Sequence, residues 1–403
     1  MSEATVGLAE IEAAREELAG VSILTPMEES HWLSTLTGGP VSLKCENLQR
    51  TGSFKARGAF IRISRLSPEE RARGVVAASA GNHAQGVALA AQQLGIPATV
   101  FMPEGAPIPK EKATRGYGAD VVFHGRYLED ALAEAHAFAE RTGAVLIHPF
   151  DHVDVVAGQG TVGLEILEQC PEVQTVLVPT GGGGLLAGIA IAVKALRPDV
   201  RVVGVQAAGA AAYPGSLAKG EPVALPSMST MADGIAVGRP GDITFAAVRD
   251  HVDEILTVSE DGLARAVLAT LERAKLLVEP AGAAAVAAML DDPTRFETPT
   301  VVVLSGGNID PLLLGKVIRH GMAAAGRYLN LRVCIPDVPG GLAQLLGEVS
   351  AVGANVIEVV HERISPTLHV DEVEVRLQLE TRGEPHAEQV LTRLRERGYR
   401  VYE

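Results

Sequence analysis

Four consecutive glycines, Gly181 to Gly184, are the residues of this chain best suited to binding a ligand through the backbone. The apolar run before them, residues 175–179, is expected to form a strand, and residues 185–197 are expected to form a helix. A glycine-rich turn that opens a helix directs several unpaired N–H groups to one point, at the positive end of the helix dipole. The loop therefore predicts a phosphate site, with a flexible linker as the alternative interpretation.

A lysine that could act as a nucleophile or a base, Lys55, lies in the segment 51–58. Ser53 is a candidate N-cap for a helix that contains this lysine. Desolvation by apolar neighbours and the helix dipole would both favour the neutral amine. A neutral amine can attack a carbonyl carbon or remove a proton. From this segment alone, a solvated surface lysine is the more ordinary interpretation.

Two other segments offer polar groups directly after apolar runs. Residues 79–83 (Ser-Ala-Gly-Asn-His) open a second helix, whose N-terminus suits a carboxylate. Asn82 can donate a hydrogen bond and His83 can titrate, although a histidine inside a helix is more often structural. Residues 305–308 (Ser-Gly-Gly-Asn) follow the run 301–304, and Ser305 offers a hydroxyl that can donate and accept. A plain strand-to-helix turn is the alternative interpretation of this last segment.

Composition narrows the class of protein. A chain of 403 residues predicts two or three units, and its net charge of −14 disfavours nucleic acid or an anionic membrane as a partner. The three cysteines Cys45, Cys170 and Cys334 have the spacing of neither a disulfide framework nor a zinc site, so we expect a reducing, cytoplasmic compartment. The first 20 residues lack the apolar core of a signal peptide, and no apolar run has the length of a membrane span.

Short β-branched runs alternate with Ala-rich helical stretches over most of the chain. The expected strands cover residues 74–78, 98–102, 120–123, 145–147, 175–179, 201–205 and 300–304, and the expected helices cover residues 83–94, 127–142, 160–169 and 262–275. Continuously apolar strands separated by helices predict an α/β fold with mostly parallel sheets covered on both faces. In such a fold, ligands bind at the carboxyl ends of the strands.

The pattern changes near residue 327. Strands are expected at 329–335, 356–363, 370–380 and 399–402, and helices at 339–352 and 384–398. This βαββαβ order is ferredoxin-like. We therefore predict a first domain over residues 1–326, with a smaller lobe nested at about 50–155, and a second domain over residues 327–403. The alternative is that the tail completes the main fold.

Together, the four polar segments resemble the site of the pyridoxal 5′-phosphate (PLP) enzymes of fold type II, the tryptophan synthase β-like family. Residues 53–55 resemble the Schiff-base lysine motif, 79–83 the substrate-carboxylate loop, 180–185 the phosphate loop and 305–308 the pyridine-nitrogen loop. The resemblance runs in order over residues 20–320 and includes the segments 25–26, 157–161, 232–237 and 279–282. Within the family, the threonine dehydratases (threonine ammonia-lyases) are the most similar, and the tail resembles an ACT domain through residues 337–340 and 353–355.

The resemblance implies a two-lobed fold, PLP as the cofactor, and Lys55 as the catalytic residue. The implied cofactor-binding residues are Phe54, Lys55, Asn82, Gly181, Gly182, Gly183, Gly184, Leu185 and Ser305. The implied substrate-carboxylate residues are Ser79, Ala80, Gly81, Asn82 and His83, with Glu279 as support for the active site. No metal is expected, because residues 206–212, where relatives place a cation site, contain no carboxylate.

The implied reaction is β-elimination on a small amino-acid substrate: L-threonine would yield 2-oxobutanoate and ammonia, a first step towards isoleucine. L-Serine is a further expected substrate. The alternatives are an L-serine or 3-hydroxyaspartate dehydratase and, from another class, a non-catalytic amino-acid sensor. Serine racemases of the family resemble this chain but carry serine at the position of Ala80, which disfavours racemisation here.

The resemblance of the tail, residues 327–403, to an ACT domain implies that an amino acid regulates the activity. Isoleucine, opposed by valine, is the expected effector, and Pro339, Gly340 and Asn355 are its candidate binding residues. The alternative is a dimerisation module that binds no ligand. We expect a homodimer or a homotetramer in either case.

Overall fold

The computed structural model describes residues 6–363, 369 and 371–402. The chain divides into two compact units, residues 1–314 and 315–403, which are described separately below. Among the described residues, no helix combines the length and the apolar character that crossing a membrane requires.

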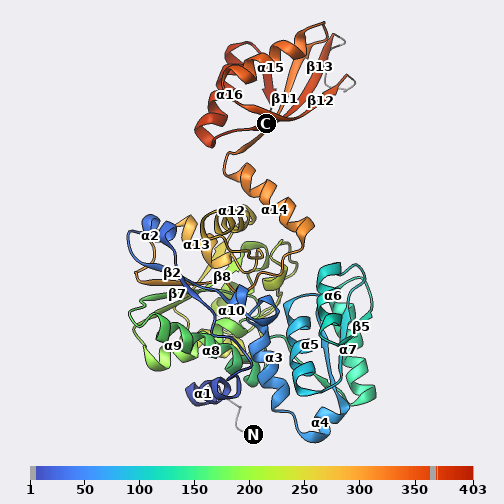
Figure 1. Ribbon diagram of the computed structural model, residues 1–403, viewed down its shortest axis with the longest axis vertical. Coiled ribbons are helices and arrows are strands. Elements are labelled where there is room, and N and C mark those ends of the chain that lie inside the picture. Colours follow the sequence, from blue (N-terminus) through green and yellow to red (C-terminus); the bar gives the residue numbers. More distant parts are fainter. Residues whose placement is uncertain (1–5, 364–368, 370, 403) are drawn as a thin grey trace. The chain divides into compact units, whose positions relative to one another are not determined.

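A six-stranded sheet forms the larger part of the first unit (Figure 1). Its order is β1-β2-β10-β7-β8-β9, and every neighbouring pair is parallel except β1 and β2. The strands are β1 (Met27–Glu29), β2 (Val41–Lys44), β7 (Thr175–Pro179), β8 (Arg201–Ala207), β9 (Glu254–Val258) and β10 (Thr300–Val303). Because β2, β10 and β7 run in parallel, the segments that follow them emerge at the same edge of the sheet.

Helices cover both faces of this sheet, with α8 (Val153–Gln169) and α9 (Gly184–Leu196) on one face and α12 (Glu260–Ala269) and α13 (Ala284–Asp291) on the other (Figure 1). Every residue of α8 from Val155 to Ile166 is buried, including the polar side chains of Gln159, Thr161 and Glu165. The remaining helices of this part are α1 (Leu8–Glu17), α2 (His31–Thr37), α10 (Ala212–Lys219) and α11 (Asp242–His251).

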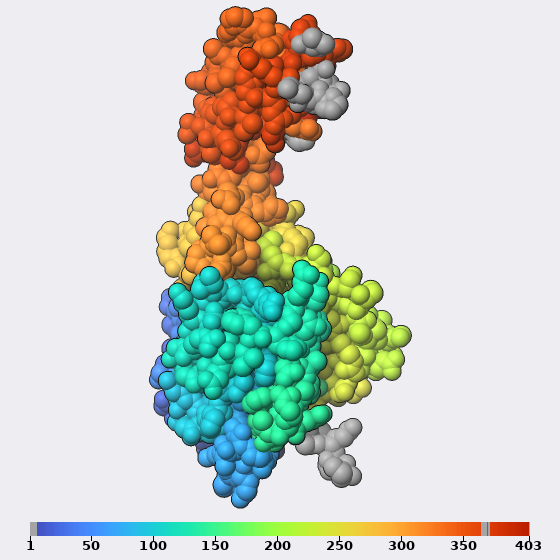
Figure 2. Space-filling model, turned by 90° about the vertical axis from the view of Figure 1, so that its right-hand side faces the viewer, coloured from blue at the N-terminus to red at the C-terminus, as the bar shows by residue number. Residues whose placement is uncertain are grey.

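Residues 55–146, called the smaller lobe here, contain a second sheet of order β5-β4-β3-β6 with all strands parallel. Its strands are β3 (Val75–Ala78), β4 (Ala98–Met102), β5 (Asp120–Phe123) and β6 (Val145–Leu146), and its helices are α3 (Lys55–Ser64), α4 (Pro68–Arg73), α5 (Asn82–Leu94), α6 (Ile108–Gly116) and α7 (Leu128–Thr142). In Figure 2 this lobe, in blue to teal, faces the viewer.

Alternation along β3 and β4 explains how both faces of the smaller sheet are buried. Val75 and Val100 pack into the main core with residues of α5, whereas Val76 and Phe101 pack with Ala131 and other residues of α7. Successive side chains of a strand point to opposite faces, so the two helices must lie on opposite sides of this sheet.

Most of the expected strands coincide closely with strands of the structure, including 98–102, 120–123 and 175–179. Strands β1, β2 and β9 are not among the strands expected from the sequence. In β1 and β9 most positions are only half-buried or exposed, so neither strand has the continuous apolar signature of a central strand.

The second unit is a four-stranded antiparallel sheet of order β12-β13-β11-β14 with two helices. Its elements are β11 (Tyr328–Pro336), α15 (Gly341–Ala351), β12 (Asn355–Glu362), β13 (Glu372–Glu380), α16 (Glu384–Glu396) and β14 (Arg400–Tyr402), and α14 (Pro311–Ala324) spans the division between the units. This is the βαββαβ order expected for the tail. Alternate residues of β11 and β13, such as Val333 and Val375, pair across the sheet and are buried with α15 and α16. Val370, the expected start of the third strand of the tail, lies outside the described residues.

Candidate active site

A single cavity lies where the carboxyl ends of the strands of the larger sheet face the smaller lobe. All four segments singled out in the sequence line it: Phe54 and Lys55, residues 79–83, residues 181–185, and Ser305. Glu279 lines it as well. The structure therefore brings together residues that are far apart in the chain, since Lys55 and Ser305 share the cavity.

Lys55 is the first residue of α3 and points its half-buried side chain into this cavity. Its Nζ donates to the carbonyl oxygen of Pro149 at 2.8 Å, and the ammonium lies 5.2 Å from the centre of the Phe54 ring. Desolvation lowers the pKa of Lys55 to about 8, against the opposing attraction of Glu279. A substantial fraction of a neutral amine is thus present in mildly alkaline solution, as a nucleophile or a base requires.

The backbone around Lys55 is held by the loop that follows β10. Ser53 pairs with Gly306 in an antiparallel bridge, and the Phe54 N–H donates to the carbonyl oxygen of Ser305 at 3.3 Å. The prediction that Ser53 caps the helix is wrong, because Phe54 occupies the N-cap position without a side-chain cap. The Ser53 hydroxyl is buried and has no hydrogen-bond partner among the described residues. Ser53 is an extended bridging residue, which its N-cap propensity does not reveal.

The glycine loop, Gly181–Gly184, connects β7 to α9. Within the described part of the chain, none of its four N–H groups has a hydrogen-bond acceptor. The carbonyl oxygen of Gly182 accepts from the hydroxyls of Tyr213 at 3.2 Å and Thr244 at 2.6 Å, which fixes the loop. Gly183 has a φ of +99°, and a Cβ there would lie 1.9 Å from the Tyr213 hydroxyl oxygen, so no other residue fits.

The start of α5 forms a second group of free backbone donors. Among the described residues, the N–H groups of Asn82 and His83 have no acceptor, and both residues line the cavity. The His83 side chain is engaged elsewhere, because its Nε2 lies 2.8 Å from the carbonyl oxygen of Ile147. A carbonyl oxygen only accepts, so Nε2 carries the proton. Burial, with the charge of Lys55, lowers the pKa of His83 to about 3, so the ring is neutral and structural.

The amide of Asn82 is oriented by two neighbours. Its Nδ2 donates to Oε1 of Glu279 at 2.6 Å, and its Oδ1 accepts from Nδ2 of Asn308 at 2.8 Å. One Nδ2 hydrogen of Asn82 therefore remains for a ligand in the cavity. Burial and the charge of Asp233 raise the pKa of Glu279 to about 7, so this carboxyl group is partly protonated at neutral pH.

A charged pair that is not among the residues expected from the sequence also lies at the cavity. Nζ of Lys110, in α6, lies 2.7 Å from Oδ2 of Asp233, and both residues line the cavity. Asp233 falls within the quoted segment 232–237, to which no role was given. Lys110 carries no local signal, because its partner is 123 residues away in the chain.

These groups fit pyridoxal phosphate. The N–H groups of Gly181–Gly184, which have no acceptor among the described residues, suit a phosphate. The amine of Lys55 and the hydroxyl of Ser305 lie in the same cavity. The family model of the "pyridoxal-phosphate dependent enzyme" matches residues 21–307. The chain belongs to this family.

Two relatives match nearly the whole chain, and a solved structure matches most of it. L-Threonine ammonia-lyase from Geobacter sulfurreducens is 50% identical over 378 residues, which cover 94% of each chain. L-Threonine ammonia-lyase from Thermotoga maritima is 46% identical over 396 residues, covering 98% of this chain and 99% of the relative. The solved structure of maize serine racemase has a TM-score of 0.74 at 36% identity and covers 79% of this chain and 99% of the maize chain.

The depressed pKa of Lys55 can be tested in the protein freed of pyridoxal phosphate. The ammonium predominates below about pH 8 and the neutral amine above it, so reductive methylation of Lys55 should rise with a midpoint near pH 8. Because Glu279 stabilises the ammonium, Glu279→Gln should move the midpoint to lower pH. Glu129→Gln, which removes another carboxylate that lines the cavity, is the matched control and should leave the midpoint in place. Mass spectrometry of the Lys55 peptide across pH gives the readout, and a wild-type midpoint above pH 10 would contradict the assignment.

Proposed function

We propose that the protein is a threonine ammonia-lyase, which converts L-threonine into 2-oxobutanoate and ammonia. The observation that carries the proposal is the convergence of Lys55, the free N–H groups of α5 and those of the glycine loop in one cavity. The near full-length similarity to two L-threonine ammonia-lyases supports the same reaction. L-Serine, which lacks only the γ-methyl group of threonine, is proposed as a second substrate.

Residues of both lobes take part in the proposed β-elimination. Bound pyridoxal phosphate would supply the electron sink that acidifies the substrate Cα–H bond. The N–H groups of Gly181–Gly184 would hold its phosphate, and the remaining Nδ2 hydrogen of Asn82 would serve its ring oxygen. Ser305 offers the ring nitrogen a neutral hydroxyl rather than a carboxylate, which suits rapid loss of a β-substituent better than prolonged carbanion storage.

Lys55 and the start of α5 act on the substrate itself. The N–H groups of Asn82 and His83 would bind the substrate carboxylate at the positive end of the helix dipole. Lys55, in its neutral form, would take the Cα proton. Its lowered pKa supports this role, because a lysine with an ordinary pKa would hold far less of the neutral amine at the same pH.

The second unit supports a regulatory role. A cavity there is lined by residues 335–340, by Leu342, Ala343 and Leu346 of α15, and by His361, Arg363 and Val373. Nη2 of Arg363 lies 3.3 Å from Oδ1 of Asp337 beside the N-terminus of α15. Among the described residues, the N–H groups of Leu342 and Ala343 have no acceptor, so a cation and helix N–H groups are both near an incoming carboxylate. We propose that this unit is an ACT domain that binds isoleucine or valine and links the activity to isoleucine synthesis.

Of the three candidate effector residues, two line this cavity and one does not. Pro339 and Gly340 line this cavity. Asn355 is not among the lining residues, and its Nδ2 donates to Oε2 of Glu380 at 3.3 Å. Arg363 is therefore the better candidate for recognition of an effector carboxylate within one chain.

The catalytic proposal is tested by measuring release of 2-oxo acids from L-threonine, L-serine and 3-hydroxyaspartate. L-Threonine should be turned over, and Lys55→Ala should lower the rate by at least about 10²- to 10⁴-fold, because both the covalent anchor and the base are lost. Lys219→Ala removes an exposed lysine at the end of α10 and should leave the rate unchanged. Retained turnover in Lys55→Ala, or a wild-type preference for 3-hydroxyaspartate over threonine, would overturn the proposal.

The regulatory proposal is tested by calorimetric titration of the full chain with isoleucine and valine. Arg363→Gln should weaken binding by roughly tenfold or more, because a charge-assisted hydrogen bond to the effector carboxylate is lost. Arg393→Gln is the control, since Arg393 is paired with Glu348 at 2.7 Å and does not line the cavity. Absence of binding to the wild-type chain would argue for a module without a ligand. Equal affinity in Arg363→Gln would contradict the role of Arg363 in binding the effector carboxylate.

A further inference from the structure

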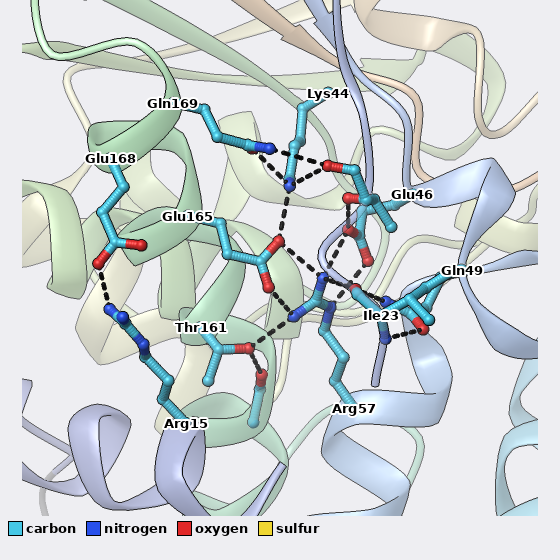
Figure 3. Close-up of polar contacts among 12 residues, drawn as sticks. Arg15, Ile23, Lys44, Glu46, Gln49, Arg57, Thr161, Glu165, Glu168 and Gln169 are labelled. Atoms are coloured by element: carbon cyan, nitrogen blue, oxygen red, sulfur yellow. Dashed lines mark hydrogen bonds and ion pairs between the residues drawn. The ribbon is translucent and has the colours of Figure 1, made fainter. Parts of the chain in front are cut away.

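Four charged side chains are buried together behind the helix that carries Lys55 (Figure 3). They are Lys44 at the end of β2, Glu46 in the turn η1 (Glu46–Leu48), Arg57 in α3 and Glu165 in α8. All four residues are buried. Their formal charges sum to zero, and none of them lines the active-site cavity. The proposed reaction makes no use of them.

Arg57 is the centre of this cluster. Its Nε and Nη2 each lie 2.9 Å from one oxygen of Glu46, and its Nη1 and Nη2 lie 2.6 and 3.0 Å from the oxygens of Glu165. Nη1 also donates to the hydroxyl of Thr161 at 3.1 Å. The planar guanidinium is thus clamped between two carboxylates on different elements. Such an arrangement fixes its orientation as well as its position.

Lys44 completes the cluster on the side away from α3. Its Nζ donates to Oε2 of Glu165 at 2.6 Å, to Oε1 of Gln169 at 2.8 Å and to the carbonyl oxygen of Thr25 at 3.0 Å, which accounts for all three ammonium hydrogens. Thr161, Glu165 and Gln169 recur every four residues, so one face of α8 supplies the acceptors. Through Arg57, the cluster therefore joins α3 to β2, η1 and α8.

The close packing of α3 against α5 and α8 shows what the contacts of Arg57 contribute to the position of this helix. A Cβ on Gly158 of α8 would lie 2.7 Å from the Cα of Gly58, and a Cβ on Gly86 of α5 would lie 3.1 Å from the carbonyl oxygen of Lys55. Both neighbouring helices thus approach α3 through glycines. The apolar side chains that α3 buries, among them Ile61 and Ile63, lie beyond its first turn. Within the first turn, residues 55–58, Arg57 is the buried side chain, so the polar contacts of Arg57 hold the part of the helix that carries Lys55.

Lys55 and Arg57 lie two residues apart at the start of the same helix, so their side chains are separated by about 200° around its axis. Lys55 points into the cavity, and Arg57 points into the buried cluster behind it. We propose that Arg57 is a positioning residue for Lys55: by fixing the rotation of α3, the cluster sets where the Lys55 amine lies in the cavity. The effect on turnover rests on the proposed function, whereas the effect on the placement of the cofactor does not.

The test replaces the planar guanidinium of Arg57 with the compact ammonium group of a lysine. Arg57→Lys retains the positive charge but cannot bridge both carboxylates in one plane. In the holoenzyme, kcat for threonine should fall by roughly 10- to 100-fold, because small displacements of a catalytic group are costly, while KM should change much less. The visible circular dichroism band per bound pyridoxal phosphate, which reports the asymmetric placement of the ring without any turnover, should change as well.

Arg62→Lys is the matched control. Arg62 belongs to the same helix, and the Nη1 of its half-buried side chain lies 3.6 Å from Oδ2 of Asp154, outside the cluster. This variant should keep the wild-type kcat and dichroism. If Arg57→Lys lowers only the thermal unfolding temperature and leaves kcat and dichroism per bound cofactor unchanged, the cluster is a stability element and the proposal is overturned.

Two further outcomes remain decisive. If Arg57→Lys does not fold, Thr161→Val is used in its place, because this substitution removes one hydrogen-bond acceptor of Arg57 without changing any charge. Its kcat should fall about fivefold, in line with one lost hydrogen bond, and a wild-type kcat with wild-type dichroism would refute the proposal. If the wild-type protein does not act on threonine, the proposed function fails, and the dichroism of the same variants still decides the role of Arg57.

Discussion

Placing an amino group in a cavity between two lobes costs free energy, because the charged form loses its hydration, and this constraint governs the site. The Nζ of Lys55 has one hydrogen-bond acceptor, the carbonyl oxygen of Pro149, among the described residues. Glu279 attracts the ammonium without forming a hydrogen bond to it, and desolvation prevails, so the pKa of Lys55 falls to about 8. The amine is thereby prepared for chemistry, but its position must be imposed by the elements around it.

Close glycine contacts between helices and a buried ionic cluster together fix the position of the Lys55 amine. Backbone-to-backbone approaches at Gly58, Gly86 and Gly158 let three helices come close enough to build the cavity wall. The apolar side chains that α3 buries, such as Ile61 and Ile63, lie beyond its first turn. The cluster of Arg57, Glu46, Glu165 and Lys44 supplies directional bonds at that first turn. A buried cluster of this kind is better explained by orientation than by stability, since desolvation offsets much of its Coulomb attraction.

The sequence allowed prediction of the features that depend on local pattern. Continuous apolar runs such as 98–102 and 175–179 predicted strands at the correct positions, and the small-residue turns after β3, β7 and β10 predicted a shared site. Features that depend on distant partners could not be predicted. Lys110 meets Asp233 across 123 residues, and Arg57 meets Glu165 across 108. Ser53 was assigned as a cap from its type alone, whereas its conformation is set by the bridge to Gly306.

The central claim is that pyridoxal phosphate is bound to Lys55 in this cavity. Reduction of the holoenzyme with borohydride, followed by proteolysis and mass spectrometry, tests it directly because the reduced linkage survives digestion. We predict one pyridoxyl group per chain, located on the peptide that contains Lys55. A label on Lys110, the other lysine that lines the cavity, or no label at all, would contradict the account.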